Sequence, residues 1–446
     1  MSTTSSAALV KQELIAKLDA CHEKLLMLIG SLPDKLEELP AAEAEIRSAV
    51  LELGRGLLQA WSETANAKAS VPQCEACQQR MRHKGYVQGP LVTTLGNVRV
   101  RRVRFRCSGC GAENYPHDAQ LRFLGHSVSP LLAKVIARMG AQLPFGQAQQ
   151  NLQVDYGVHL AKRTMQLVCE EAGMAVVNEE DQQRTQLQSL PPAQRPAALP
   201  DSEIRPEKAY VYADGTMIHS AGDWHEVRVA SVASVDEDDQ PLKIDHRARF
   251  LSCEDFGWQL LLLARSAGYH HAQQRAFIAD GARWLWEQAA MHFPGAVQIL
   301  DWYHLAEHVH DVTNVLHAQG SQEAKRFSKQ RLKELWEERS SQTLRRLKEL
   351  RKKTRAPAKR EALRKLIGYL ENNRGRINYP KYRQLGLRVG SGQVEGACKT
   401  LVGTRCKQAG MRNWTRRGAQ GVLRIRTALQ TGQYDDLWKT LTNIAA

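Results

Sequence analysis

The sequence lacks any long apolar run and any recognisable targeting segment at its start. No window of about 18 consecutive apolar residues occurs, so we expect no bilayer-spanning helix and no membrane partner. Met1 to Ala8 are small and polar, without the charged start and apolar core of a signal peptide. No internal repeat is evident. These absences favour a cytoplasmic protein built from ordinary globular domains.

Acidic residues are in deficit. The 446 residues include 47 Asp and Glu against 62 Lys and Arg, which gives a net charge of +15. A positive balance of this size favours a polyanionic partner such as nucleic acid, although it indicates no particular reaction. Hydrophobic residues make up 43% of the chain, enough for a normal core, and the length suits two to four domains.

Disulfides are not expected in a cytoplasmic chain, so its nine cysteines need another explanation. Four of them form two Cys-x-x-Cys pairs, and residues 78–106 separate these pairs. Two such pairs are typical of a tetrahedral structural zinc site, although the usual separation is only about 15–20 residues. We therefore predict a zinc ribbon held by Cys74, Cys77, Cys107 and Cys110. The scattered remainder are interpreted as small buried residues, namely Cys21, Cys169, Cys253, Cys398 and Cys406.

The span between the cysteine pairs contains a plausible β-hairpin. Leu95-Gly96-Asn97-Val98 provides the turn, and alternate apolar residues follow it at Val98, Val100, Val103 and Phe105. The same strand is crowded with positive charge, which either contacts phosphates or only keeps the strand soluble. The residues concerned are Arg99, Arg101, Arg102, Arg104 and Arg106.

Helical patterns flank the ribbon. Upstream, Leu14, Leu18, Cys21, Leu25 and Leu28 have coiled-coil spacing, and an apolar face continues beyond Pro33 to Leu57. This region is either a helical hairpin packed on the protein or a dimerisation element. Downstream, helices are expected over 131–141, 145–154 and 160–172. The last two are separated by Gly157, as in a helix-turn-helix, with Lys162 and Arg163 available to DNA. A plain helical bundle is the alternative.

Three apolar strands are predicted to end in carboxylates. They are Tyr210–Ala213 before Asp214, Ala276–Ala279 before Asp280, and Val297–Leu300 before Asp301. Two further strands are expected over 224–234 and 242–250, and helices over 256–268 and 282–292. Three strands followed by alternating strands and helices are the plan of an RNase H-like fold. One Asp-Gly after a strand is usually only a turn, but this sequence has two, in the order that such a fold requires.

A third carboxylate follows a long helical segment. Glu395 begins a predicted helix within Gly390-Ser391-Gly392-Gln393-Val394-Glu395-Gly396, and the long helices of 305–372 separate it from Asp280. Three carboxylates suit two Mg²⁺ ions about 3.5–4 Å apart, with Mn²⁺ as a substitute. One ion activates water or a 3′-hydroxyl, and the other stabilises the leaving oxygen.

Four strings in this region resemble a known family. VYADGT, IADGA, ILDWYH and GSGQVEGACK are similar to insertion-sequence transposases of the ISKra type, which are related to the Mutator-like DDE group. The resemblance covers about residues 210–438, and the zinc-ribbon region is also similar. It implies that Asp214, Asp280 and Glu395 form the catalytic triad. It further implies that Asp301 and His304 match an Asp-x-x-His motif and support the site, for which a helix cap and a packed histidine are the alternative.

Two segments concentrate positive charge near the predicted site. Residues 325–365 contain 17 Lys or Arg against five Glu, which favours contact with phosphates over a merely solvated face. Trp336 lies there and is interpreted as a core residue, with base stacking as the alternative. The second cluster follows Glu395 and is expected to clamp DNA. Its members are Arg405, Lys407, Arg412, Arg416, Arg417, Arg424 and Arg426.

The sequence therefore predicts an α/β multidomain DNA transposase. It would cleave and join strands at transposon ends with Mg²⁺, act as a homodimer or larger oligomer on double-stranded end and target DNA, and associate with the nucleoid. A non-catalytic DNA-binding regulator and another RNase H-like nuclease remain alternatives. The expected regions are helices (1–69), the zinc ribbon (70–120), the helix-turn-helix (121–185), a linker (186–208), the first part of the catalytic core (209–304), a helical insertion (305–385), and the rest of the core with a basic tail (386–446).

Overall fold

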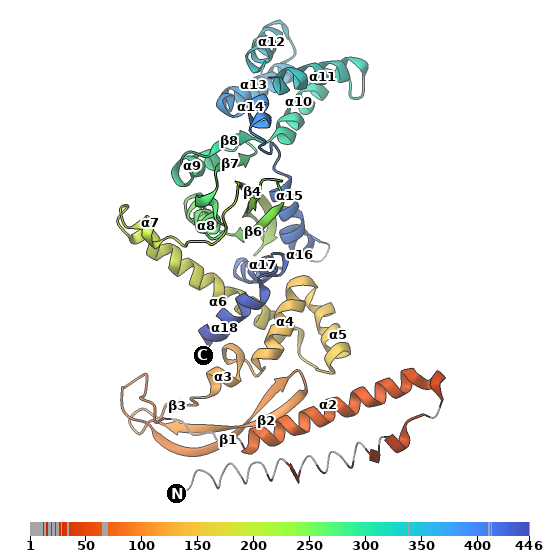
Figure 1. Ribbon diagram of the computed structural model, residues 1–446, viewed down its shortest axis with the longest axis vertical. Coiled ribbons are helices and arrows are strands. Elements are labelled where there is room, and N and C mark those ends of the chain that lie inside the picture. The colour runs from red at the N-terminus through yellow and green to blue at the C-terminus, as the bar shows by residue number, and fades with distance from the viewer. Residues whose placement is uncertain are drawn as a thin grey trace. The chain divides into compact units, whose positions relative to one another are not determined.

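The architecture comes from a computed structural model of the chain. It describes residues 12, 15–16, 19, 23, 26–27, 29–33, 35–64, 70–337, 339–408, 411 and 413–445. The predicted coiled-coil positions Leu14, Leu18, Cys21, Leu25 and Leu28 lie outside these residues, as does Arg412. The chain divides into two compact units, which are Met1–Val176 with Gln433–Ala446, and Val177–Gly432. Each unit is described by itself (Figure 1).

The first unit contains the expected β-hairpin. Strands β1 (Arg82–Thr93) and β2 (Gly96–Arg106) pair antiparallel, and the short β3 (Glu113–Asn114) extends the sheet beside β2. The turn lies at Thr94 and Leu95, and Gly96 follows with a φ of +105°, a conformation that favours glycine. The predicted apolar alternation is confirmed, because Val98, Val100, Val103 and Phe105 are all buried.

A long helix packs against this hairpin. Helix α2 (Leu39–Thr64) follows the short η1 (Leu36–Glu38). The side-chain amide of Gln59 accepts from the Arg99 N–H at 2.6 Å and donates to the Arg99 carbonyl at 2.9 Å. Leu58 packs on the small core of Leu91, Val98 and Val100. The helix is thus packed on its own chain, and dimerisation remains a prediction.

The three expected helices are present as α4, α5 and α6, preceded by two short helices, and α6 extends from the first unit into the second. The short helices are α3 (Asp118–Leu121) and η2 (Phe123–Gly125), and the three expected ones are α4 (Pro130–Gln142), α5 (Phe145–Tyr156) and α6 (Lys162–Ser189). Ser129 caps α4 by accepting from the Leu132 N–H at 3.2 Å, and Gly157 ends α5 with a φ of +65°. Helix α6 continues well beyond the predicted residue 172, across the boundary between the units and into the predicted linker. It ends just before Pro191 and Pro192, which lack the N–H that a helix interior needs.

The last helix joins the first unit rather than the predicted catalytic region 386–446. In α18 (Tyr434–Ala445), the Trp438 ring stacks on Phe123 with centroids 5.1 Å apart, and Asp435 pairs with Lys134 at 2.5 Å. This placement depends on contacts between residues far apart in the chain, which a local pattern does not reveal.

The second unit is built on a five-stranded mixed sheet. Its strands are β4 (Lys208–Ser220), β5 (Asp223–Val235), β6 (Pro241–Arg249), β7 (Gln274–Ala279) and β8 (Val297–Leu300), in the spatial order β6-β5-β4-β7-β8. The first three pair antiparallel, whereas β7 runs parallel to β4 and β8 runs parallel to β7. The predicted order of three strands followed by alternating strands and helices is confirmed.

Helices cover both faces of this sheet. Helices α8 (Cys253–Ser266) and α9 (Arg283–His292) lie on one face, where Arg228 of β5 contacts Cys253 at 3.3 Å and its guanidinium lies over Trp284. Helix α15 (Gly392–Ala397) packs on β4 and β5 from the other face, as Figure 1 shows. Side chains alternate between the faces of a strand, so neighbouring residues of β4 point to different helices.

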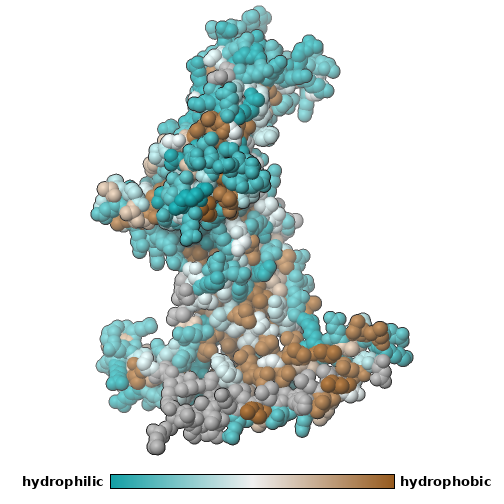
Figure 2. Space-filling view, in the orientation of Figure 1, coloured by the Kyte–Doolittle hydropathy of each residue, from teal (hydrophilic) through white to brown (hydrophobic). Residues whose placement is uncertain are grey.

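An all-helical segment separates β8 from α15, as predicted. It consists of α10 (Trp302–Leu316), α11 (Gln322–Trp336), α12 (Ser340–Lys353), α13 (Pro357–Asn372), η4 (Arg374–Arg376) and α14 (Tyr379–Gln384). Trp336 packs on Trp302 with ring centroids 4.6 Å apart and stacks on Tyr379, which supports the core interpretation of this residue. The visible surface over α11 to α13 is mostly hydrophilic in Figure 2, in keeping with its charge.

The remaining elements of the second unit are short helices and α17. They are α7 (Arg195–Ala198), η3 (Tyr269–His271), the π-helical η5 (Cys398–Gly403), α16 (Thr404–Cys406) and α17 (Arg416–Gln430). Among the described residues of the chain, no helix has both the length and the apolar composition needed to cross a bilayer.

Candidate active site and zinc centre

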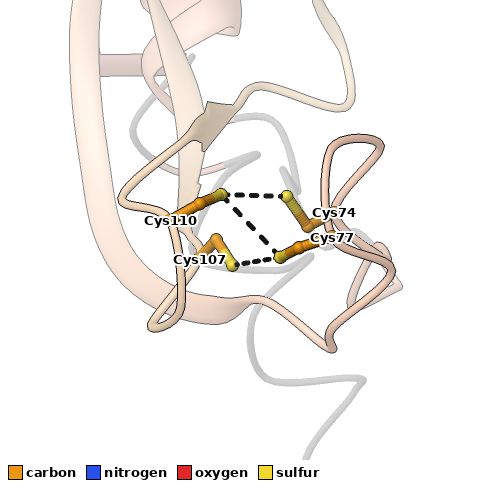
Figure 3. A group of neighbouring side chains, drawn as sticks. All are labelled: Cys74, Cys77, Cys107 and Cys110. Atoms are coloured by element: carbon orange, nitrogen blue, oxygen red, sulfur yellow. Dashed lines mark hydrogen bonds between the residues drawn. The ribbon is translucent and has the colours of Figure 1, made fainter.

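The four predicted zinc ligands meet in the first unit. Cys74 and Cys110 lie 3.4 Å apart at their sulfurs, Cys77 and Cys107 also 3.4 Å, and Cys77 and Cys110 3.8 Å (Figure 3). A tetrahedral zinc ion about 2.3 Å from each sulfur requires sulfurs about 3.8 Å apart. The four side chains therefore fit a structural zinc ion.

Two similar turns present these thiols. Gln78 N–H donates to the Cys74 carbonyl at 2.8 Å, and Gly111 N–H donates to the Cys107 carbonyl at 3.1 Å. Both residues follow the second cysteine of a pair and have positive φ values of 57° and 77°. The Cys110 N–H, followed by the Cys77 thiol, lowers the pKa of Cys107 to about 6. The turn thus favours the thiolate that zinc binds.

Several ribbon arginines have partners within the ribbon region. Arg102 pairs with Asp118 at 2.7 Å, Arg104 with Glu113 at 3.7 Å, and the Arg101 guanidinium lies 3.8 Å from the centre of the Tyr86 ring. Arg99 and Arg106 are exposed. Part of the positive charge of this strand is therefore used for packing inside the protein.

Strand register brings the two central aspartates to one level of the sheet. Tyr212 of β4 is paired with Ile278 of β7, and Asp214 and Asp280 each follow two residues later. The expectation that Asp214 ends its strand is wrong, because β4 continues to Ser220 through its pairing with β5. Only the parallel pairing with β7 stops here. Asp280 does follow β7 directly, as predicted.

Asp214 lies in a partly buried, electrostatically crowded position. Its Oδ1 accepts from the Gly215 N–H at 2.7 Å, and its Oδ2 accepts from the Cys398 thiol at 3.7 Å. Burial raises the pKa of Asp214, and the negative charge of Asp280 adds to this effect while His304 opposes it. A divalent cation would relieve this effect, because it favours the ionised form of Asp214 next to the charge of Asp280.

The helical segment holds the backbone of Asp280. The Tyr369 hydroxyl of α13 donates to the Asp280 carbonyl at 2.7 Å, while Asp280 Oδ1 accepts from the Ala282 N–H at 2.9 Å. Gly281 has a φ of +105°, and a Cβ there would lie 2.8 Å from the Tyr369 ring. The close approach of α13 thus requires glycine in the Asp-Gly pair.

Asp301 is fully buried and connects two backbone segments. Its Oδ1 caps α10 by accepting from the His304 N–H at 2.6 Å, and its Oδ2 accepts from the Ser391 N–H just before α15. The cap interpretation is confirmed for Asp301, which also holds the loop that leads to Glu395. His304 is half-buried, with its ring 4.8 Å from that of His308 and its Nδ1 3.5 Å from Glu307.

Glu395 and Cys398 lie one helical turn apart on the same side of the sheet. The Ser391 hydroxyl donates to Glu395 Oε1 at 3.2 Å. Burial raises the pKa of the Cys398 thiol, and the nearby charges of Asp214 and Glu395 raise it further. The sequence predicts Cys398 only as a small buried residue, whereas the structure leaves it partly exposed and in contact with Asp214. Its spacing of three from Glu395 was the available signal, because residues three apart share a helix face.

The three carboxylates do not form a site for a single ion. Within the described part of the chain, two groups bring three or more ligand atoms within 4.8 Å of one another, namely the four cysteines and Asp201 with His270 and His271. A site for two ions tolerates larger distances between the carboxylate oxygens. Ions about 3.5–4 Å apart, each about 2.0–2.1 Å from its ligands, accept carboxylate oxygens up to about 8 Å apart. The oxygen donors present suit Mg²⁺ chemically.

The second basic cluster divides into exposed and buried residues. Lys407 Nζ donates to Thr216 Oγ1, two residues beyond Asp214 on the same face of β4. Arg416 and Arg417 are exposed at the start of α17, and Lys162 and Arg163 are exposed at the start of α6 in the first unit. Arg405 is only 1% exposed, beside Trp414, so its assignment as a DNA contact is wrong for this structure. Arg424 and Arg426 are also buried, the former 2.8 Å from Glu180.

Part of the chain is similar to a known protein family. Residues 237–438 match the model of an uncharacterised protein family (UPF0236). The matched segment begins in the loop before β6 and extends into α18, so it includes Asp280, Asp301 and Glu395 but not Asp214. No curated protein matches the chain.

Proposed function

We propose that this protein is a DNA transposase whose second unit has an RNase H-like fold with an Asp214, Asp280 and Glu395 metal site. The observation that carries the proposal is the shared level of Asp214 and Asp280 on neighbouring parallel strands, with the Glu395 helix packed on β4. The strand order, with three antiparallel strands extended by two parallel ones, is the order that such a fold has. The interruption between β8 and α15 matches an insertion before the third carboxylate.

The residues around the triad have distinct roles in the proposed reaction. Two Mg²⁺ ions held by the carboxylates would supply Lewis-acid stabilisation of the attacking and leaving oxygens at phosphorus. Asp301 is a positioning residue, because it ties the start of α10 to the Ser391 backbone and so orients α15. Lys407 lies beside Thr216, and its ammonium group can donate a hydrogen bond to a phosphate oxygen of the substrate strand. Cys398 donates to Asp214 and limits the ways that carboxylate can rotate.

The remaining parts fit DNA handling. Exposed Lys162 and Arg163 lie at the start of the third helix of the helix-turn-helix candidate, the end that enters a major groove in such proteins. The basic helices α11 to α13 track phosphates, and the zinc ion expected at the four cysteines holds the ribbon together. A homodimer or higher oligomer bridges two ends, in the cytoplasm and on the nucleoid.

The test uses the full chain with the DNA ends of the genetic element that encodes it. We expect cleavage and joining of 3′ ends with Mg²⁺ or Mn²⁺, and a loss of joining rate of about 100- to 1,000-fold in each of Asp214→Asn, Asp280→Asn and Glu395→Gln. DNA binding should be retained in all three. Glu237→Gln, which changes an exposed acid in the β5–β6 loop, is the matched control.

Three outcomes distinguish the alternatives. Strand joining that depends on the three carboxylates supports the transposase. Binding of the ends without cleavage by the unaltered protein would instead indicate a regulator, and cleavage of branched DNA alone would indicate another nuclease. Full activity in Asp214→Asn would overturn the assigned site whatever the reaction.

A further inference from the structure

A second group of metal-ligating side chains lies at the other end of the β4–β7 pair from the carboxylates. Asp201 precedes β4, and His270 and His271 form the η3 turn that precedes β7. Lys208 of β4 is paired with Gln274 of β7, so these two segments enter the sheet side by side. The carboxylates Asp214 and Asp280 lie beyond the opposite ends of the same pairing.

Two imidazoles converge on one carboxylate oxygen. Nε2 of His270 lies 2.6 Å from Asp201 Oδ1, and Nε2 of His271 lies 2.8 Å from the same atom. The two rings lie side by side, with centroids 3.8 Å apart. Consecutive residues usually point in different directions along a chain, whereas here the 3₁₀ turn directs both Nε2 atoms to one point.

The backbone around this group is held in place by contacts within the second unit. Gly268 has a φ of +80°, and a Cβ there would lie 2.5 Å from the Ile204 carbonyl oxygen. Arg265 Nε donates to the Pro200 carbonyl at 3.2 Å, and the Gln274 N–H donates to the Glu207 carbonyl at 3.0 Å. The segment carrying Asp201 and the turn carrying the histidines therefore keep a fixed relation without any added ion.

We propose that Asp201, His270 and His271 bind a divalent transition-metal ion, of which Zn²⁺ is the expected example. Two imidazole nitrogens and one carboxylate oxygen are a ligand set that zinc accepts, with water completing the shell, whereas Mg²⁺ prefers oxygen donors. The Asp201 side chain is 71% exposed, so an ion reaches the group from solvent. The bound ion would clip the segment before β4 to the turn before β7.

This site should bind zinc less tightly than the four cysteines. A ligating histidine usually donates its second ring N–H to an acceptor, which fixes the ring. His270 Nδ1 is buried without a hydrogen-bond partner, so this support is missing at one ligand. The site also offers three protein ligands, whereas the ribbon offers four thiolates. Moderate chelator treatment is therefore expected to empty this site first.

Cobalt titration of the full-length protein tests the proposal. We expect at least two Co²⁺ ions per chain. The tightest gives intense thiolate charge-transfer bands, and a second, held by Asp201, His270 and His271, gives only weak visible bands. Asp280→Asn removes any further ion held by the carboxylates and should leave both of these ions in place. Losing a residue that only hydrogen-bonds to a metal ligand lowers affinity about 10- to 100-fold. Because His271 is itself a ligand in this proposal, His271→Ala should lower the affinity for the second ion by more than that. The thiolate bands should not change. His310→Ala, an exposed histidine on α10, is the matched control.

A second variant guards against a failure to fold. Asp201→Asn keeps the shape of the side chain but removes its charge, and it should also weaken the second ion while leaving the first. Binding of a single Co²⁺ by the unaltered protein would overturn the proposal and leave the three side chains as a hydrogen-bonded clip. An equal second affinity in both variants would overturn it as well.

Discussion

The four-cysteine centre and the carboxylate site are assembled in opposite ways. Each cysteine pair comes from one short turn, and the two turns meet with sulfurs 3.4–3.8 Å apart. Each carboxylate comes from a separate element, Asp214 from β4, Asp280 after β7 and Glu395 from α15. The spacing of residues along the chain therefore specifies most of the first site and little of the second. The second depends on strand register and on how the helical segment returns the chain to the sheet.

The two sites also differ in what holds them without metal. Backbone N–H groups lower the pKa of Cys107 and prepare it for an ion, whereas burial raises the pKa of Asp214. A metal ion is thus expected to contribute to folding at the cysteines. At the carboxylates, it is expected to relieve repulsion in a scaffold that is already folded.

The largest effect is expected at the zinc ribbon. Cys107→Ser should remove the zinc ion and unfold the ribbon locally, because structural zinc contributes on the order of 10 kcal/mol of apparent binding free energy. Hydrogen exchange and metal analysis would measure both effects. In Cys107→Ser, the amides of β7 and β8 should stay protected from exchange. The control variant Cys253→Ser, which changes a cysteine on α8, should keep the zinc ion of the ribbon. Loss of protection in both units would mean that the ribbon is not an independent zinc-dependent element.

A smaller effect is expected at the buried positioning residue. Asp301→Asn keeps the side-chain shape but replaces one of two acceptor oxygens, leaving a backbone N–H without its partner. Urea unfolding should show a loss of about 1–3 kcal/mol. Asp311→Asn, at an exposed position on the same helix, should change stability little. Equal stabilities for the two variants would contradict the anchoring role of Asp301.

The pH dependence of Asp214 gives a third test. Because the folded state raises the pKa of this carboxyl, its ionised form costs stability above the ordinary aspartate pKa. Asp214→Asn should therefore stabilise the metal-free protein at pH 7. The gain should vanish as the pH falls below the ordinary aspartate range, where both states are protonated.

Thermal melts with and without Mg²⁺ measure this difference. Added Mg²⁺ should raise the melting temperature of the unaltered protein and not that of the variant. The difference between the two melting temperatures should therefore shrink or change sign. If the stability difference between the two proteins changes with neither pH nor Mg²⁺, the Asp214 carboxylate neither destabilises the metal-free protein nor binds Mg²⁺.

The smallest effects are expected at the exposed arginines of the second cluster, and a buried arginine of that cluster provides the contrast. Arg416→Gln and Arg417→Gln change exposed residues, and each should reduce the slope of log affinity for DNA against log salt by about 1. Arg405→Gln changes a buried residue and should instead lower stability by about 1–3 kcal/mol without altering that slope. Filter binding across a salt series separates these outcomes, and an unchanged slope in all three would remove this cluster from the DNA interface.

Local patterns predicted most of the secondary structure. Apolar alternation identified β2, continuous apolar runs identified β4, β7 and β8, Ser129 and Pro130 marked the start of α4, and the cysteine spacing predicted the ribbon. Helix ends were less certain, because the extension of α6 to Ser189 depends on where prolines finally stop it. Exposure was the weakest point, since Arg405, Arg424 and Arg426 have the same local charge pattern as the exposed Arg416 and Arg417.

By itself, the sequence determined the ligand types, the order of strands and helices, and the two cysteine turns, because these depend on residues close together in the chain. Only the tertiary structure decided that Asp214 lies inside a continuing strand, that Cys398 reaches it, that Asp301 holds the Ser391 loop, and that Asp201 meets two histidines. These relations come from packing and register between distant segments, where the energy of a contact depends on partners that no local pattern contains.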